Sequence, residues 1–370
     1  MSFPATTRTS KVGAPLGVII TLGVVAGLIL ISAAAVNPVG TGVAFVLTSV
    51  AMTVVVLAYL WLDRWEPEPP RLLVLAFVWG ASVAAIVSVV LEVYVESVIN
   101  PGSKNVSPAS VGIVAPLIEE AAKGLFLLLM MTGRRRNEMN SLTDCLVYAG
   151  ITAAGFAWLE DIFYIADGGL STAAVRLVMG PFAHSLFTTM TAVGVYFALQ
   201  RRNAVAKIGC ILLGYLGAVI MHGLWNGSAL MGSGVYLLVY LLWMVPIFGL
   251  AIWLGVASRR REQRVVAAKL PGMVAAGVVT PNEATWLSSI RSRKRAIAEA
   301  TRAGGKPAGK TVKRFAAHVV ELAFVRDRID RSFGNERVSA LLNDEAYAVY
   351  AARAAAPILQ WLGEHHTPAA

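Results

Sequence analysis

Long apolar runs recur along the chain, and short polar segments that carry most of the lysine and arginine separate them. Eight runs are long enough, or nearly so, to cross a hydrocarbon core of about 30 Å as helices. They cover residues 15–35, 43–62, 72–97, 111–131, 142–165, 173–199, 207–231 and 235–257. The pattern therefore predicts an all-α polytopic membrane protein, with about eight transmembrane helices in a domain of residues 1–257.

Beyond residue 257 the long apolar runs stop, and the remaining residues, 258–370, are expected to form a soluble helical tail. In the stretch TPNEATWL (280–287) the threonine, proline and glutamate are spaced as in a capping box at a helix start. The glycines of AGGKPAGK (303–310) indicate a break. Apolar residues at helical spacing return over 312–331 and 336–362, so further helices are predicted there.

Composition and charge agree with this division. Of the 370 residues 56% are hydrophobic, and the mean hydropathy is +0.65, as is typical of membrane proteins. The net charge of +10 resides mainly in the tail, which holds 19 basic and 10 acidic residues. A basic segment beside a bilayer is expected to attract anionic lipid, and nucleic acid is not an expected partner. The tail histidines, His318, His365 and His366, follow no spacing typical of a site.

Lysine and arginine positions predict the orientation in the membrane. They gather before the first predicted span and after the second, fourth, sixth and eighth. The alternate loops contribute little beyond Lys104 and Arg176. By the positive-inside rule, both termini are expected on the cytoplasmic side of a bacterial-type plasma membrane.

Four predicted spans carry polar groups that a lipid-facing helix would exclude. In chain order they are Glu119, Glu120 and Lys123, then Glu160, Asp161 and Tyr164, then His184, and finally His222 and Asn226. With the predicted topology and a rise of 1.5 Å per residue, all of them lie roughly 8–18 Å below the outer surface. Three pairs are spaced i, i+4 and share a helix face, so we expect the group to converge inside the bundle.

These residue types suit hydrolysis. Two imidazoles and a carboxylate match a catalytic Zn²⁺ site with one position open to water, which predicts His184 and His222, with Glu160, as metal ligands. A further carboxylate can act as general base, a role that we assign to Glu119, or alternatively to Glu120.

Asn226 is the remaining predicted catalytic residue, because it can donate to a developing oxyanion. Lys123, Asp161 and Tyr164 have supporting roles, and Lys123 can keep the adjacent carboxylates ionised. The alternative is a proton- or ion-coupled transporter that uses the same buried Glu and His residues. Internal repeats and interrupted helices, which are typical of transporters, are not evident apart from Gly180-Pro181.

Several motifs resemble the PrsW family of intramembrane proteases. They are LDRWEPEPPRLLVLAFVWGA (62–81), EEAAK (119–123), FAWLEDIFY (156–164), the histidine of PFAHSLFTT, and HGLWN (222–226). The resemblance covers roughly residues 60–257. Asp161 departs from it, because asparagine is expected there more often.

The resemblance implies a membrane-embedded metalloendopeptidase, distantly related to the CAAX-processing membrane proteases. Its substrate would be a membrane-anchored protein, such as an anti-sigma factor, and we expect cleavage near the outer leaflet. Carried over by motif, the resemblance implicates as site residues Glu119, Glu120, Glu160, His184, His222 and Asn226. A glutamate-activated water without zinc is an alternative mechanism within the wider superfamily.

Overall fold

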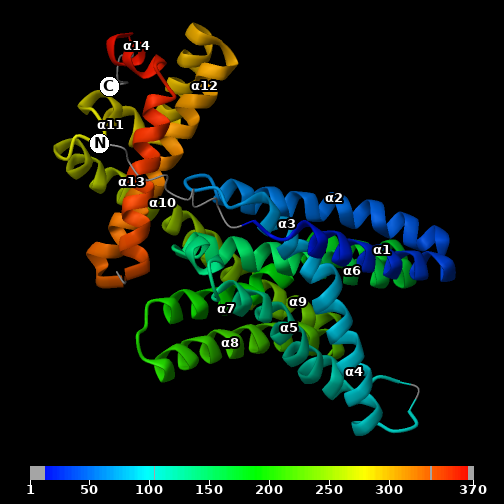
Figure 1. Cartoon of the computed structure of the whole chain (residues 1–370). Helices are drawn as coiled ribbons and strands as arrows, with labels where there is room; N and C mark the ends of the chain where they lie inside the picture. The colour runs from blue at the N-terminus through cyan, green and yellow to red at the C-terminus, as the bar shows by residue number, and fades with distance from the viewer. Residues whose placement is uncertain (1–12, 104, 334–335, 366–370) are drawn as a thin grey trace. The chain divides into compact units, whose positions relative to one another are not determined.

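The computed structural model describes residues 13–103, 105–333 and 336–365, and every regular element in these ranges is a helix (Figure 1). The described chain divides into two compact units. Among the described residues, the membrane unit comprises 13–63 and 68–256, and the soluble unit comprises 64–67, 257–333 and 336–365. Each unit is described separately below.

Six helical stretches of the described chain are long and apolar enough to cross a membrane. They are Leu16–Val36, Pro38–Leu62, Pro70–Ile99, Leu142–Leu199, Ala204–Leu230 and Ser233–Ala275. The fourth stretch is 58 residues long and contains two of the predicted spans. The predicted span at 111–131 corresponds largely to α5, which has only 16 residues and contains three buried charged groups. The polytopic all-α class is thus confirmed, and the number of eight spans stays a prediction.

The elements of the membrane unit follow one another closely in the chain (Figure 1). They are α1 (Leu16–Val36), α2 (Pro38–Leu62), α3 (Pro70–Trp79), η1 (Gly80–Ala84), α4 (Ala85–Ile99), η2 (Ser110–Val114), α5 (Ala115–Met130), η3 (Arg135–Glu138), α6 (Leu142–Ala174), η4 (Val175–Met179), α7 (Ala183–Leu199), α8 (Ala204–Leu230), α9 (Ser233–Val239), η5 (Tyr240–Met244) and the first part of α10 (Val245–Ala275).

Helix α6 is the central helix of the membrane unit and packs against α2, α3 and α7. It begins at a capping box made by Ser141 and Asp144, and small residues let its neighbours come close. A Cβ atom on Gly155 would lie 2.0 Å from the carbonyl oxygen of Phe77, and one on Gly80 would lie 1.9 Å from that of Thr152. Close backbone contact of this kind is a common basis for helix association in membranes.

The segment between α2 and α3 is anchored to α6 through a buried carboxyl group. The Tyr148 hydroxyl donates to Glu68 Oε2 at 2.6 Å, and the Glu68 amide donates to Asp63 Oδ2 at 2.8 Å. Burial, reinforced by the nearby charge of Asp144, raises the pKa of Glu68 well above its ordinary value. The folded state therefore favours protonated Glu68.

The soluble unit contains the end of α10 and four further α-helices: α11 (Pro281–Leu287), α12 (Ile290–Arg328), α13 (Glu336–Ala354) and α14 (Ile358–His365), with η6 (Ile329–Phe333) after α12. The capping box predicted at 280–287 is confirmed, because the Thr280 side chain accepts from the Glu283 amide and the Glu283 carboxylate accepts from the Thr280 amide. The break predicted at 303–310 is also present, at Gly305 (φ +77°) inside α12.

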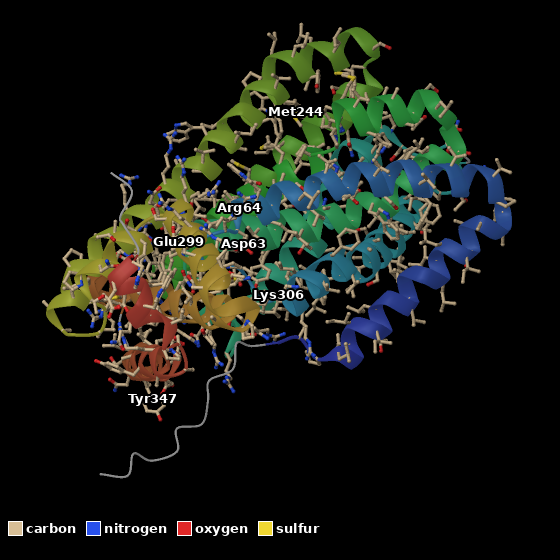
Figure 2. The ribbon with its side chains drawn as sticks, turned by 90° about the horizontal axis from the view of Figure 1, so that it is seen from above. Asp63, Arg64, Met244, Glu299, Lys306 and Tyr347 are labelled. Atoms are coloured by element: carbon tan, nitrogen blue, oxygen red, sulfur yellow. The ribbon has the colours of Figure 1, made fainter. Side chains whose placement is uncertain are left out.

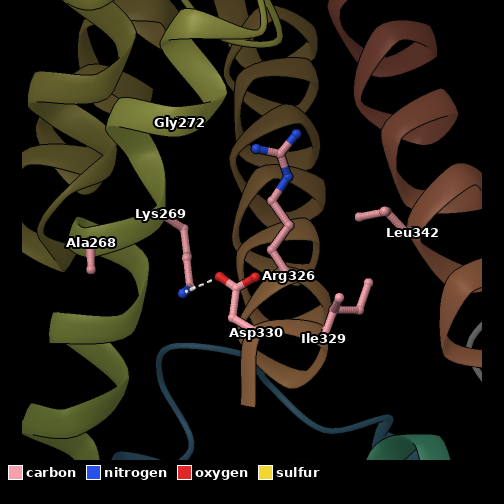
Figure 3. Close-up of a pocket in the computed structure, with 7 residues that line it drawn as sticks. All are labelled: Ala268, Lys269, Gly272, Arg326, Ile329, Asp330 and Leu342. Atoms are coloured by element: carbon pink, nitrogen blue, oxygen red, sulfur yellow. Dashed lines mark hydrogen bonds and ion pairs between the residues drawn. The ribbon is translucent and has the colours of Figure 1, made fainter. Parts of the chain in front are cut away.

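Side chains differ in kind between the two units. The outward side chains of the membrane-unit helices are largely hydrocarbon, whereas the soluble unit carries many nitrogen and oxygen atoms around the labelled Glu299, Lys306 and Tyr347 (Figure 2). The soluble unit has its own core, which includes Trp286, Phe315 and residues from α10, α12, α13 and α14. It also contains a cavity of about 430 Å³, in which Lys269 Nζ lies 2.7 Å from Asp330 Oδ2 (Figure 3).

Candidate active site in the membrane unit

Helices α5, α6, α7 and α8 pack against one another and bring the predicted polar residues together. Helix α5 carries its charged residues on a buried face. Glu119, Glu120 and Lys123 are all buried, with at most 4% of each residue exposed. His184 on α7 and His222 on α8 are buried as well. Because unpaired charge is costly in this environment, the contacts among these residues determine what the group can do.

Glu120 has partners at both carboxylate oxygens. Its Oε1 lies 2.6 Å from Lys123 Nζ and 3.1 Å from His222 Nδ1, and its Oε2 accepts the Thr188 hydroxyl at 2.9 Å. The His222 ring stacks on Phe187 with centroids 4.7 Å apart. Glu120 is therefore placed to orient the histidine and to pair with the lysine.

Glu119 faces both histidines. Its Oε2 atom lies 3.9 Å from His184 Nδ1 and 3.8 Å from His222 Nε2. Donor atoms of these three residues all lie within 4.8 Å of one another. Lys123 Nζ lies beside the same atoms, 3.5 Å from Glu119 Oε2 and 3.2 Å from His184 Nδ1, and 4.4 Å from the Phe156 ring centroid.

Glu160 lies on the other side of the His184 ring, where its Oε2 is 2.8 Å from His184 Nε2. The Arg176 guanidinium forms ion pairs with both Glu160 and Asp161. It also lies over the Tyr164 ring, 4.2 Å from the centroid. Arg176 reaches these residues because the helix breaks at Gly169 (φ +67°) and the chain then returns through η4.

Asn226 has a different partner. It follows His222 by one turn of α8, and its Nδ2 donates to the carbonyl oxygen of Val111, at 3.2 Å, in the π-helical segment η2. A Cβ atom on Gly223 would lie 2.7 Å from Gly112 O, so α8 and η2 are in close contact here. The amide is thus beside the group rather than bonded to its carboxylates or imidazoles.

Two members of the group were not predicted. Thr188 had a detectable signal, because it follows His184 by four residues and shares its helix face. Arg176 had none, because its pairing with Glu160 and Asp161 depends on the reversal of the chain after Gly169.

The donor set fits a divalent metal. Glu119, His184 and His222 supply one carboxylate and two imidazoles, the ligand types of hydrolytic zinc sites. The second nitrogen of each ring lies near a further carboxylate, Glu160 for His184 and Glu120 for His222, as is common for metal-binding histidines. Among the described residues, four carboxylates, counted with Asp161, share two cationic side chains, Lys123 and Arg176, so the group favours an added cation.

Comparison with known proteins agrees with the predicted resemblance. Protease PrsW of Geobacillus kaustophilus is 25% identical over 219 residues, which cover 58% of this chain and 90% of that protein. Protease PrsW of Oceanobacillus iheyensis is 25% identical over 206 residues, 54% of this chain and 92% of the relative. Protease PrsW of Bacillus subtilis is 23% identical over 224 residues, 60% of this chain and 97% of the relative. No solved structure matches.

The model of the PrsW family of intramembrane metalloproteases matches residues 68–252, half of the chain. The matched range contains every residue of the buried group described above, from Glu119 on α5 to Asn226 on α8. The expected metalloendopeptidase activity and membrane location are those of this family, and the chain belongs to the PrsW family of intramembrane metalloproteases.

Proposed function

We propose that Glu119, His184 and His222 hold the catalytic metal of this protease, and that the metal is Zn²⁺. The observation that carries this proposal is the convergence of their donor atoms, within 4.8 Å of one another, from three helices. The same geometry favours Glu119 over Glu160 as the carboxylate ligand, because Glu160 lies at the opposite nitrogen of His184. When bound, such a metal supplies Lewis-acid chemistry, polarising a carbonyl and lowering the pKa of water.

Glu119 is the proton acceptor in this proposal. Its Oε2 faces the two imidazoles, and its second oxygen, Oε1, is the atom that takes a proton from the attacking water and passes it to the leaving amine. Glu120 is a positioning residue, because Lys123, His222 and Thr188 occupy its two oxygens. Glu160 positions His184 in the same way through Nε2.

Asn226 is the proposed oxyanion donor. Its Nδ2 carries two hydrogens, and the bond to Val111 O uses one of them. The second can be donated to the oxygen of a tetrahedral intermediate, where preorganised donors act most strongly in a dry site. Val111, whose carbonyl group accepts from the amide, belongs to the π-helical segment η2.

The proposed substrate is a membrane-anchored protein, such as an anti-sigma factor, cleaved near the outer leaflet of a bacterial plasma membrane. The distribution of basic residues supports this location, because the positive-inside rule then predicts both termini in the cytoplasm and the site in the outer half of the bilayer. The basic residues of 258–370 are proposed to attract anionic lipid at the inner surface.

The decisive experiment combines metal content with cleavage in proteoliposomes. A panel of single-span proteins is the substrate, and mass spectrometry locates the cut. We expect the His184→Ala/His222→Ala variant to contain about one zinc ion per chain less than the wild type, and both it and Glu119→Gln to be inactive. Thr189→Val is a matched control, because this buried residue of the same helix bonds Ser185 O and the Tyr59 side chain and none of the carboxylates or imidazoles of the group described above.

Three results would contradict the assignment. Full cleavage by Glu119→Gln would exclude Glu119 as proton acceptor. Unchanged metal content in the double histidine variant, together with lost cleavage, would favour a glutamate-activated water without zinc. Substrate-independent proton flux that needs the same glutamate would support the transporter alternative.

A further inference from the structure

A second group of metal-binding side chains lies in the soluble unit, outside the residues matched by the family model. His318 and Glu321 are one turn apart on α12, and Glu345 is on α13, which packs along α12. The three histidines of this region show no spacing typical of a site in the sequence, so only the packing of two helices brings this group together.

The distances suit coordination by one ion. His318 Nδ1 lies 3.2 Å from Glu345 Oε2 and 3.8 Å from Glu321 Oε2, and donor atoms of all three residues lie within 4.8 Å of one another. A tetrahedral ion with metal–ligand bonds of about 2.0–2.2 Å separates its ligands by roughly 3.3–3.6 Å. Small rotamer adjustments therefore bring the three donors onto one ion.

The three side chains meet at one atom. Both carboxylates face the same nitrogen, Nδ1, and the lone pair of this nitrogen in a neutral imidazole is a metal ligand. Glu345 is buried, with 7% of the residue exposed, so its charge is expensive without a cation. A divalent cation pairs with both carboxylates at once and uses the Nδ1 lone pair of the neutral imidazole.

We propose that His318, Glu321 and Glu345 form a divalent metal site that ties α12 to α13. One imidazole and two carboxylates, with no thiolate, favour Zn²⁺ or a similar first-row ion over Cu⁺. Two ligands from one helix and one from its neighbour make the ion a cross-link, so its binding stabilises the folded soluble unit. The site is independent of the proteolytic site, and this inference does not rest on the proposed function.

The test uses the full-length chain in detergent and inorganic Zn²⁺ as the probe. The His184→Ala/His222→Ala background removes the membrane-unit ligands, so Zn²⁺ that still binds reports on the soluble unit. We expect about one Zn²⁺ per chain in this background, and at least a tenfold rise in Kd when His318→Ala or Glu345→Gln is added. His365→Ala is the matched control, since this exposed histidine bonds and stacks on Trp361 and is not part of the His318, Glu321 and Glu345 group, and it should leave the Kd unchanged.

A second measurement keeps the proposal testable if the background variant does not fold. After removal of metal by a chelator, added Zn²⁺ should raise the unfolding temperature of Glu119→Gln protein. The rise should be clearly smaller in Glu119→Gln/His318→Ala protein. Absence of Zn²⁺ binding in the folded background overturns the proposal. Equal Zn²⁺ binding or equal stabilisation with and without His318→Ala overturns it as well.

Discussion

Replacement of Arg176 tests how Glu160 and Asp161 are held at the candidate active site. The guanidinium pairs with Glu160 and Asp161, and about a fifth of the Arg176 side chain is exposed. Arg176→Met keeps much of the side-chain bulk and leaves two neighbouring carboxylates without their cation. We expect Glu160 to move away from His184 Nε2, because Arg176 no longer offsets the repulsion between the Glu160 and Asp161 carboxylates.

The magnitude follows from the burial of the three groups. Loss of one partner from a fully buried pair costs about 3–5 kcal/mol, and the partial exposure of Arg176 and Glu160 places this case near 3 kcal/mol. Loss of a residue that orients a metal-binding histidine lowers metal affinity or activity by about 10–100-fold. We therefore expect Arg176→Met to reduce kcat/KM within that range and to lower the unfolding temperature in detergent.

A second substitution separates the electrostatic explanation from simple damage. Asp161→Asn removes one of the two carboxylates and introduces the amide expected in the family. Arg176→Met/Asp161→Asn should therefore recover a large part of both activity and stability, and the two substitutions should be strongly non-additive in a double-mutant cycle. Additive effects, or wild-type kcat/KM in Arg176→Met, would refute the positioning role of Arg176.

Three further predictions concern the supports of the site. Thr188→Val removes the hydroxyl that donates to Glu120 Oε2, so kcat/KM should fall by about tenfold. Thr189→Val should stay near the wild-type value, and equal kcat/KM values for the two variants would contradict the role of Thr188. Gly155→Ala places a methyl group 2.0 Å from Phe77 O and should destabilise the protein by about 1–3 kcal/mol in thermal unfolding, whereas Gly209→Ala, with open space around it, should not. The pKa of Glu68 is raised in the folded state, so the stability of the wild type should fall as pH rises from the ordinary glutamate pKa towards the folded value. Glu68→Gln should lose this part of the pH dependence, which unfolding scans at pH 5 and pH 8 measure. An unchanged difference in stability between the two pH values would show that Glu68 is not its source.

Local patterns were sufficient for the helices and for most members of the buried polar group, but not for Thr188 and Arg176 or for the pairing within the group. The i, i+4 spacing of Glu119 and Lys123 indicated a shared face, and both residues are buried in contact. Spacing could not distinguish Glu119 from Glu160 as the carboxylate nearest both histidines, because that choice depends on which side of the His184 ring each helix lies. The pairing of Arg176 was likewise not predictable from spacing. The sequence indicated a loop residue, but the chain reverses after the helix break at Gly169, and Arg176 therefore pairs with Glu160 and Asp161.

The buried charges of the membrane unit explain one another. Each carboxylate would be costly alone in hydrocarbon, but Lys123 lies beside Glu119 and Glu120, and Arg176 lies beside Glu160 and Asp161. These two cations leave the four carboxylates together short of positive charge, although Lys123 already lies beside Glu119 and His184 at the point where these two residues meet His222. A divalent cation there would balance the group, whereas additional lysine or arginine pairing would occupy the donor atoms. The incomplete pairing of charge is therefore the physical reason to expect a metal at this point. In a purely structural ion-pair network, each carboxylate would have a cationic partner and no such deficit would remain.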